Sequence, residues 1–427
     1  MTWTNWTGDQ RCDPAGRAVP RSPEELAEIV GAATAEGTAV KVVGSGHSFT
    51  EAALTDGLQI ALDRLAGVLD VDGDRVTVGA GTTIAQLNRE LHARGRALAN
   101  LGDIDRQTIA GAISTATHGT GARLPNLSAQ VVGLELVTAA GERLRLAADD
   151  DPDAFAAARV GIGALGAISA VTLRTVPAFV LHRRDEVREL DDVLATVDAE
   201  AAAHDHYEFF AFPYGGRACT IRRDRTDAPA RGRSWLARRV GEPIGQVAID
   251  GVFRFTRRFP GTIPTLCRVA APLASEGEYV DHSPAVFVSD RRVRFTEIEY
   301  AVPRAAGPEV VRRIVEWVQA ERYPVAFPLE CRVVAGDDAW LSPTYERDAF
   351  YVAVHQFVGM PWEPYFAAVE AIVADHGGRP HWGKRHALDA ATLRERYPRF
   401  DDFLAVRERL DPTGTFVNGY VRRCLGV

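Results

Sequence analysis

The sequence predicts an α+β fold, and three features of the chain lead to this prediction. Short β-branched runs, such as 67–71 and 75–78, lie close together and are joined by hairpin signals. Helical patterns separate some of these runs, but strands and helices do not alternate regularly as in a doubly wound parallel sheet. The chain of 427 residues, 46% hydrophobic and 25% charged, is long enough for two or three globular domains.

The first predicted unit begins with a helix and a short buried strand. Ser22-Pro23-Glu24-Glu25 provides an N-cap residue, a proline at the first helical position and acidic residues in the first turn. Apolar residues then recur at helical spacing, so we predict a helix that ends near Glu36-Gly37. The valine-rich run at 39–43 predicts the buried strand that follows the helix.

A glycine loop, Gly44-Ser45-Gly46-His47-Ser48, follows this strand directly. Its glycines allow positive φ angles, and consecutive free amides in such a turn can bind a phosphate group. A dinucleotide-binding turn would have a third glycine three residues after the second, where this chain has Phe49. The loop alone favours equally a cofactor-binding turn with a functional His47 and an ordinary turn with a surface histidine.

Two more segments rich in small residues occur in the first unit. The segment 107–121 carries hydroxyls and glycines that suit contact with a flat or anionic ligand, although tight helix packing explains 111–116 well. The segment 159–166 is a third glycine-rich turn, and Pro177 marks the predicted end of the unit. Strands are predicted at 59–62, 67–71, 75–78, 131–138, 143–146 and 168–176, with a hairpin turn at Asp72-Gly73 and a helix from Thr82 to Gly95.

Helices and strands alternate in the second part of the chain, from Val180 to about Gly377. Helices are predicted at 190–203, 308–321 and 361–376, and strands at 207–213, 293–300, 330–334 and 350–357. A strongly basic region at 217–268 is interrupted by an apolar stretch at 244–252. A run of charge is usually a solvated face, so we favour that interpretation over a surface that docks on a membrane or a partner.

Composition excludes several classes of function. A net charge of −8 argues against a nucleic-acid partner. No apolar run approaches the roughly 20 residues that span a bilayer, and the N-terminus lacks the pattern of a signal peptide. The five cysteines are scattered without the spacing of a metal site. We therefore expect a cytoplasmic protein with reduced thiols, no metal ion and no membrane contact.

The two lysines stand out in this chain, because the other 47 of its 49 cationic residues are arginine. This bias moves every tolerant site away from lysine, so a lysine that remains is expected where arginine does not fit. An ammonium group is more compact than a guanidinium group, and burial readily lowers its pKa. We therefore expect Lys384 to occupy a site where arginine does not fit, whereas the sequence indicates no role for Lys41.

The three glycine segments and the ending His381-Trp382-Gly383-Lys384 together resemble the FAD-linked sugar-lactone oxidoreductases of the vanillyl-alcohol-oxidase superfamily. This group includes the L-gulonolactone and D-arabinonolactone oxidases, with the alditol oxidases as relatives. The resemblance is strongest over 40–175, 328–334 and 379–425. It implies an FAD-binding domain at 1–177, a substrate-binding domain on an antiparallel sheet at 178–378, and a segment at 379–427 that returns to the FAD domain.

The resemblance also implies a set of cofactor-binding residues. FAD is expected to be covalently bound through His47, because this family attaches its flavin to the histidine of this loop. Gly102 matches a position beside the flavin ring where a small residue leaves room for oxygen. The implied cofactor-binding residues are Val42, Val43, Gly44, Ser45, Gly46, His47, Ser48, Gly102, Thr108, Gly111, Thr115, Ala116, Thr117, His118, Ile168 and His381.

On the substrate side, Glu330 and Arg332 match the Glu-x-Arg strand of the family, and alternate residues of a strand share one face. A carboxylate can hold sugar hydroxyls, and a guanidinium can stabilise an alkoxide or a reduced flavin, although an ordinary cross-strand ion pair would look the same. Glu297 and Glu299 also share a strand face, and we interpret them as a solvated or structural pair. The implied catalytic residues are Glu330, Arg332 and Lys384, and the implied substrate-binding residues are Asp103, Glu330, Arg332, His355 and Lys384.

The activity that the resemblance implies is oxidation of a secondary hydroxyl group of an aldono-1,4-lactone. Hydride would pass to the flavin, which oxygen or another acceptor would reoxidise. The sequence does not choose among gulono-, galactono- and arabinono-lactones. An alditol oxidase, a lactone dehydrogenase with another acceptor, and a flavin-binding protein without turnover are the alternatives.

Overall fold

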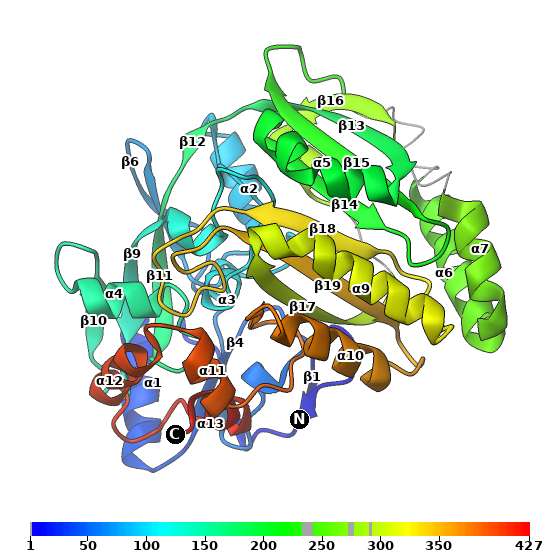
Figure 1. Ribbon diagram of the computed structural model, residues 1–427. Coiled ribbons are helices and arrows are strands. Elements are labelled where there is room, and N and C mark those ends of the chain that lie inside the picture. The colour runs from blue at the N-terminus through cyan, green and yellow to red at the C-terminus, as the bar shows by residue number, and fades with distance from the viewer. Residues whose placement is uncertain (1, 233–241, 272–276, 290–292) are drawn as a thin grey trace.

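The computed structural model describes residues 2–232, 242–271, 277–289 and 293–427, and three sheets dominate its architecture (Figure 1). The smallest of the three is parallel, with the strand order β3-β5-β4, and the helix α1 connects two of its strands. The side chain of Ser22 accepts a hydrogen bond from the Glu25 amide, as the predicted N-cap requires. Its elements are β3 (Gly16–Ala18), α1 (Pro23–Ala35), β4 (Val40–Val43) and β5 (Leu58–Ala61).

The second sheet is antiparallel and has the order β10-β9-β11-β7-β6. The predicted hairpin turn is displaced by one residue, because Asp72 pairs with Arg75 and the two loop residues are Gly73 and Asp74. The elements of this region are β6 (Val68–Asp72), β7 (Arg75–Gly79), α2 (Ile84–His92), α3 (Ile109–Ser114), β9 (Val131–Val137), β10 (Arg143–Leu146), α4 (Pro152–Ala158) and β11 (Ala167–Arg174).

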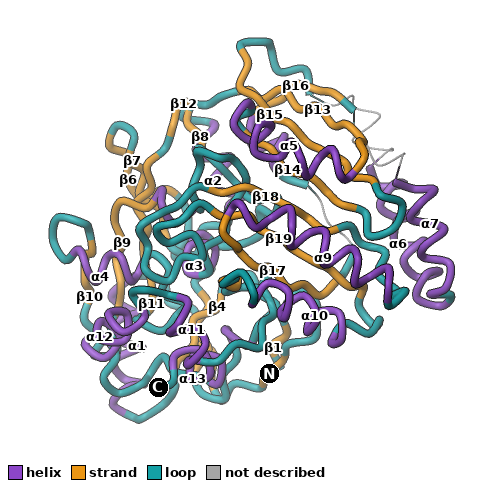
Figure 2. The backbone as a smooth tube through the Cα atoms, viewed as in Figure 1, coloured by secondary structure: helices purple, strands orange, loops and turns teal. Residues whose placement is uncertain are grey.

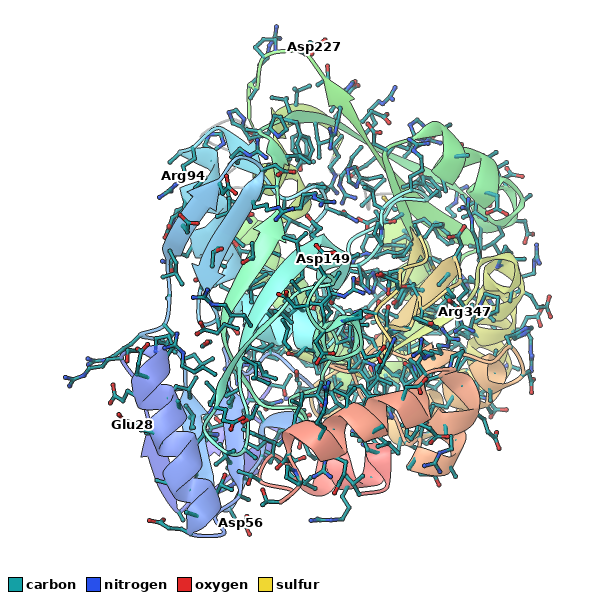
Figure 3. All side chains as sticks on the ribbon, turned by 90° about the vertical axis from the view of Figure 1, so that its left-hand side faces the viewer. Glu28, Asp56, Arg94, Asp149, Asp227 and Arg347 are labelled. Atoms are coloured by element: carbon teal, nitrogen blue, oxygen red, sulfur yellow. The ribbon has the colours of Figure 1, made fainter. Side chains whose placement is uncertain are left out.

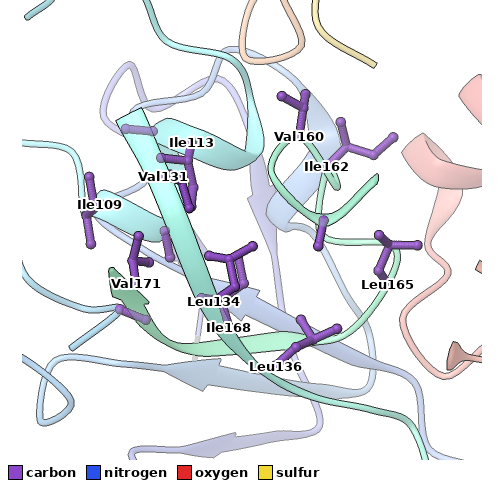
Figure 4. Packing of buried hydrophobic residues seen from close by; sticks show 14 of the residues in the cluster. Ile109, Ile113, Val131, Leu134, Leu136, Val160, Ile162, Leu165, Ile168 and Val171 are labelled. Carbon is purple, nitrogen blue, oxygen red and sulfur yellow. The ribbon is translucent and has the colours of Figure 1, made fainter. Parts of the chain in front are cut away.

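Two short strand pairs complete the N-terminal part of the fold. They are β1 (Trp3–Thr4) with β2 (Arg11–Cys12), and β8 (Arg96–Ala97) with β12 (Val176–Pro177). Side chains of α3, β9 and β11 fill the core between these elements, where Ile109, Leu134 and Ile168 lie in one cluster (Figure 4).

The third sheet is antiparallel, and its eight strands run in the order β16-β13-β15-β14-β18-β19-β17-β20. The sequence did not predict β13, β15 or β16, because charged side chains interrupt their apolar pattern. The strands are β13 (Val180–Glu189), β14 (His206–Ala211), β15 (Arg217–Thr226), β16 (Glu278–His282), β17 (Phe295–Pro303), β18 (Leu329–Val334), β19 (Ala349–Phe357) and β20 (Arg379–Pro380).

The two faces of this large sheet differ in chemistry. Apolar side chains of one face, among them Phe209, Cys331 and Val352, pack in a single core with three helices (Figures 1 and 2). The alternate residues of the same strands, such as Glu208 and Arg332, are charged and still buried. The helices are α5 (Leu190–Ala203), α9 (Gly307–Ala320) and α10 (Glu363–Ala374).

The basic region at 217–268 is only partly the solvated face that we expected. Arg222 and Arg223 belong to the interior strand β15, and they form ion pairs with Glu200 and Glu208. The helices α6 (Glu242–Arg258), α7 (Ile263–Ala270) and α8 (Ser283–Phe287) follow, and Arg254, Arg257 and Arg258 on α6 are exposed. Residues 233–241 of this region lie outside the described residues.

The outer surface carries charge of both signs. Glu28, Asp56, Arg94 and Asp149, for example, are exposed on separate elements (Figure 3). None of the helices in the described ranges combines the length and the hydropathy that crossing a bilayer requires.

The C-terminal segment packs on the first part of the chain. After β20 come the helices α11 (Ala390–Arg396), α12 (Phe400–Leu410) and α13 (Gly419–Leu425). Tyr397, Phe403 and Tyr420 of these helices lie in the same hydrophobic cluster as Leu26 and Ile60. The sequence did not predict α11 or α13, since both are short and their apolar residues are few. The division at 177 and 378 stays a prediction.

Asn418 connects this C-terminal segment to the glycine-loop region. Its side-chain amide donates hydrogen bonds to the carbonyl oxygens of Glu51, Ala52 and Leu54 at 3.0, 3.2 and 2.9 Å. Its side-chain oxygen accepts a hydrogen bond from the Val421 amide at 3.0 Å and so caps α13.

We predict that Asn418→Ala lowers the free energy of unfolding by about 1–2 kcal/mol, because three carbonyl groups and the start of α13 lose their partner. Urea denaturation of the purified chain measures this change. Asn418→Asp keeps the capping oxygen but loses the amide donors, so its stability should be intermediate. An unfolding curve of Asn418→Ala that coincides with the wild type contradicts this role.

Candidate active site

The glycine loop lies between β4 and the start of α3. Gly46 has a φ of 69°, which an amino acid with a side chain adopts only at a cost. A Cβ on Gly44 would lie 2.3 Å from the side-chain oxygen of Thr108, so only glycine allows this approach. Thr108 itself caps α3 by accepting a hydrogen bond from the Gly111 amide. The turn that the sequence predicted is therefore fixed by its packing against α3.

A cavity opens beside this loop. Its wall suits an extended anionic cofactor, because it presents the backbone amides of the loop and several hydroxyl groups. The hydroxyl of Thr50, a wall residue only 4% exposed, has no hydrogen-bond partner among the described residues. The predicted cofactor-binding residues in this wall are Val42, Val43, Gly44, Ser45, Gly46, His47, Ser48, Thr108, Gly111, Thr115 and Ile168.

The third glycine segment forms another part of the same wall. Ile162 has a φ of 45° and Gly163 one of 66°, and the left-handed conformation is rare for a β-branched residue such as isoleucine. The Ile162 amide donates to the Ser114 carbonyl oxygen at 3.1 Å, which ties the segment to α3. Backbone strain of this kind gathers at ligand sites. The glycine pattern of this segment was visible in the sequence, but a cofactor role was predicted only for Ile168, which follows it.

A second cavity shares His47, Ser48 and Gln107 with the first. It lies at the inner face of the eight-stranded sheet. The predicted residues that line it are Gly102, Asp103, Thr117, His118, Arg332, His381 and Lys384. Ala116 lines neither cavity, because its side chain is fully buried in the core, and its φ of 56° makes it part of a tight turn.

His47 stands at the junction of the two cavities. The ring of Trp6 stacks on it with 5.6 Å between the centroids, and the Trp6 amide donates to the Gly46 carbonyl oxygen at 2.8 Å. Burial, with the nearby charges of Lys384 and Arg106, lowers the pKa of His47 to about 4. The imidazole is therefore neutral at physiological pH and keeps a lone pair for a bond. No pattern in the sequence indicated that Trp6 covers this ring.

Arg332 is surrounded by carboxylates on the inner face of the sheet. It forms ion pairs with Glu330, with Glu208 at 2.8 Å and with Asp103 at 3.6 Å. Burial opposes its charge, but Glu330 and Glu208 raise the pKa of Arg332 well above its usual value. Burial also opposes the charge of Glu208, yet Arg223 and Arg332 lower its pKa to about 2. This cluster stays charged, and Arg332 reaches the second cavity.

Lys384 pairs with Glu297, whose carboxylate oxygen lies 2.5 Å from its ammonium nitrogen. Burial lowers the pKa of Lys384, but Glu297 and Glu299 outweigh this effect and raise it. The expectation that burial brings this lysine toward neutrality is therefore wrong. Glu297 and Glu299 are 4% and 5% exposed, so interpreting them as a solvated pair is also wrong. Nearby cations stabilise the negative charge of both carboxylates, so these groups can stay buried in the site.

His355 and Glu330 stand behind the wall of the second cavity. The His355 Nε2 atom lies 3.4 Å from a Glu297 oxygen and 3.9 Å from a Glu330 oxygen. His355 is 3% exposed, and neither residue is among those that line the two cavities. Both residues therefore act on the site through Glu297 and Arg332 in this arrangement.

His118, Glu299 and His381 form a buried cluster whose ligand atoms are close enough for a metal ion. His118 directs Nδ1 to the Gly119 carbonyl oxygen and Nε2 to the Glu299 carboxylate, at 2.8 and 3.0 Å. His381 accepts the Gly383 amide at Nδ1. A hydrogen bond thus joins His118 to Glu299, and His381 lies beside them.

Burial and hydrogen bonding set the charge states of Glu299 and His381 in this cluster. Burial raises the pKa of Glu299, but the charge and hydrogen bond of His118 hold it well below its usual value. Burial lowers the pKa of His381 to about 3, so this ring stays neutral. Tyr351 stacks on His118 with 3.7 Å between the centroids.

Comparison with known proteins identifies the family. The family model for D-arabinono-1,4-lactone oxidase matches residues 171–424, and a model for an FAD binding domain matches residues 14–147. The chain is 48% identical to L-gulono-1,4-lactone dehydrogenase of Mycobacterium tuberculosis over 99% of both chains. It is 34% identical to L-gulonolactone oxidase of Bos taurus, over 99% of this chain and 98% of that one. Alditol oxidase of a Streptomyces species is 33% identical, with the same coverage.

Solved structures agree on the fold. A solvent-stable cholesterol oxidase superposes with a TM-score of 0.83 at 20% identity, covering 100% of this chain and 97% of that one. The α+β fold with an FAD-binding domain and a large antiparallel sheet is thereby confirmed. Because the lactone-oxidase model spans more than half of the chain, and full-length relatives exceed 30% identity, this protein belongs to the D-arabinono-1,4-lactone oxidase family of FAD-dependent enzymes, which oxidise a CH–OH group of sugar lactones.

Proposed function

We propose that this enzyme oxidises a secondary hydroxyl group of L-gulono-1,4-lactone or a closely related aldono-1,4-lactone. The observation that carries the proposal is the second cavity, where Arg332 and Lys384 meet next to the loop of His47. The full-length relative with 48% identity is named as a dehydrogenase of L-gulono-1,4-lactone, which favours this lactone and a non-oxygen acceptor.

FAD would be held by the glycine loop, α3 and the third glycine segment in the first cavity, with its redox-active ring toward the second. When bound, it accepts a hydride from the substrate carbon. His47 is the residue for a covalent bond, because its neutral ring joins both cavities and Trp6 holds it in place. His381 and His118 would border the ring, and His381 is neutral.

The substrate would lie between Asp103, Arg332 and Lys384, which all line the second cavity. Lys384 stays charged and therefore acts as a hydrogen-bond donor, which stabilises negative charge on the reacting oxygen. Arg332 supplies a second cation, and Glu330 fixes its guanidinium. Glu297 fixes the ammonium of Lys384, and His355 supports Glu297 from behind.

An alditol oxidase is the second candidate, because an enzyme of that name matches nearly the whole chain. Anaerobic mixing with a panel of aldonolactones and alditols tests both, since the true substrate bleaches the bound flavin. Admission of air or of a dye then identifies the acceptor. Bleaching by alditols but by no lactone overturns the proposal in favour of the second candidate.

We predict that FAD is covalently attached to His47. Acid denaturation of the wild type should leave the yellow colour on the chain, because a neutral, partly buried imidazole is a nucleophile at physiological pH. In His47→Ala the colour should pass into the filtrate and activity should fall. His92→Ala, which changes an exposed histidine, should behave as the wild type. Colour lost from the wild type excludes the bond.

We predict that Lys384→Arg keeps the fold and the flavin but slows flavin reduction by about tenfold or more. The ammonium fits between Glu297 and the ring of Phe49, 5.1 Å from its centroid, where a planar guanidinium is too wide. Stopped-flow absorbance measures this step. Arg385→Lys, the reverse exchange at the neighbouring position, is the matched control. Equal reduction rates for Lys384→Arg and the wild type would mean that charge alone suffices.

We predict that Gly102→Ala slows reoxidation by oxygen more than reduction by substrate. Gly102 lines the second cavity, and a Cβ there would lie 3.1 Å from the His118 carbonyl oxygen, so a methyl group crowds this wall. The two half-reactions are measured separately by stopped flow. Gly251→Ala, where a Cβ meets open space, is the control. Equal slowing of both half-reactions removes Gly102 from the path of oxygen.

A further inference from the structure

Lys41, for which the sequence offered no role, lies in the wall of the first cavity. It is 2% exposed and comes from β4, three residues before Gly44 of the glycine loop. Burial of a lysine is costly unless a partner stabilises its charge. The composition of the chain does not explain why a lysine is buried at this position.

The local partners of Lys41 do not neutralise its charge. Its ammonium donates to the Gly163 carbonyl oxygen at 3.0 Å, and no carboxylate of the described residues lies within ion-pair distance. Asp411 acts on it only from farther away, since the oxygens of Asp411 accept the amides of Thr415 and Phe416 at 2.7 and 3.0 Å. An ammonium has three donors, so two are not used by Gly163.

Lys41 differs in charge from the other described residues that line this cavity. Apart from the neutral His47, it is the one basic residue among them, and none of them is acidic. Beside Lys41 in the sheet lies Gln59, which is fully buried and whose amide atoms have no hydrogen-bond partner among the described residues. The wall thus contains one cation and the unsatisfied hydroxyl of Thr50, and the unsatisfied amide of Gln59 lies beside Lys41 in the sheet.

We infer that Lys41 is a cofactor-binding residue whose ammonium supplies the positive charge opposite the anionic diphosphate-containing half of FAD. The same ammonium group holds the strained turn at Gly163 against the cavity wall. One side chain therefore fixes the shape of the site and also gives it a positive charge. The inference rests on FAD binding by the family and is independent of the lactone proposed above.

A dependence on pH follows from this arrangement. Burial lowers the pKa of Lys41 to about 7 before the cofactor binds, although Asp411 acts in the opposite sense. An anionic ligand favours the charged form, so binding takes up a proton whenever the pH exceeds about 7. The affinity for FAD should therefore fall as the pH rises from about 7 to about 9, by up to about tenfold per pH unit.

The test uses the His47→Ala chain purified with its FAD, so that the cofactor can leave whether or not the wild type binds it covalently. Dilution at about pH 6 and about pH 9 releases FAD, and its fluorescence gives the dissociation constant. Lys41→Gln in this background keeps an N–H donor for Gly163 but removes the charge. It should weaken FAD binding at pH 6 by about tenfold or more and abolish the pH dependence. Arg17→Gln, an exposed cation whose strand pairs with that of Gln59, should change neither.

Two results would overturn the inference. If Lys41→Gln binds FAD as tightly as its parent with the same pH dependence, Lys41 only holds the Gly163 turn. If the parent itself shows no loss of FAD affinity between about pH 7 and about pH 9, the ammonium does not face the anion, and this measurement needs no Lys41 variant to fold. Neither readout involves a substrate, so failure here is distinct from failure of the proposed activity.

Discussion

Pairing of buried charge on the inner face of the eight-stranded sheet is the constraint on which the site depends. Arg332 is stable there only because Glu330 and Glu208 surround it, and Lys384 only because Glu297 contacts it. Every pair is buried, so each group needs its partner to remain ionised. Together they form a rigid wall of fixed charge with little need to reorganise during the reaction, which is how electrostatic stabilisation becomes effective.

The two cavities are joined by segments that are far apart in the chain. The Phe49 amide donates to the Gly383 carbonyl oxygen, and the His381 amide donates to the Glu299 carbonyl oxygen on β17. The C-terminal segment thereby runs between the glycine loop and the edge of the large sheet. Its helices α11 to α13 then pack in the hydrophobic cluster that contains Leu26 and Ile60. If that packing were lost, His381 and Lys384 would be displaced together. The packing of these helices therefore explains how a segment so remote in the sequence can place both residues in the site.

Around the first cavity, the main structural constraint is the close approach of backbone segments to their neighbours, rather than charge pairing. Gly44 meets Thr108, and Ile162 and Gly163 are left-handed in another part of the cavity wall. Consecutive amides in such turns suit the phosphate groups of a long ligand. Lys41 is the exception, since it brings a single cation into this otherwise neutral wall. The cofactor cavity and the reaction cavity thus use different means of recognition, and His47 stands where they meet.

The sequence by itself determined the elements with local signals and the residues with a family motif. The cap at Ser22, the glycine loop and the alternation of Glu330 and Arg332 depend on neighbours a few positions away, so they could be predicted. Only the tertiary structure decided that Glu297 and Glu299 are buried, that Lys384 stays charged, that Trp6 covers His47 and that Lys41 faces the cofactor cavity. Each of these depends on charges and rings brought together by sheet pairing and by the returning C-terminal segment, and no local pattern encodes such long-range proximity.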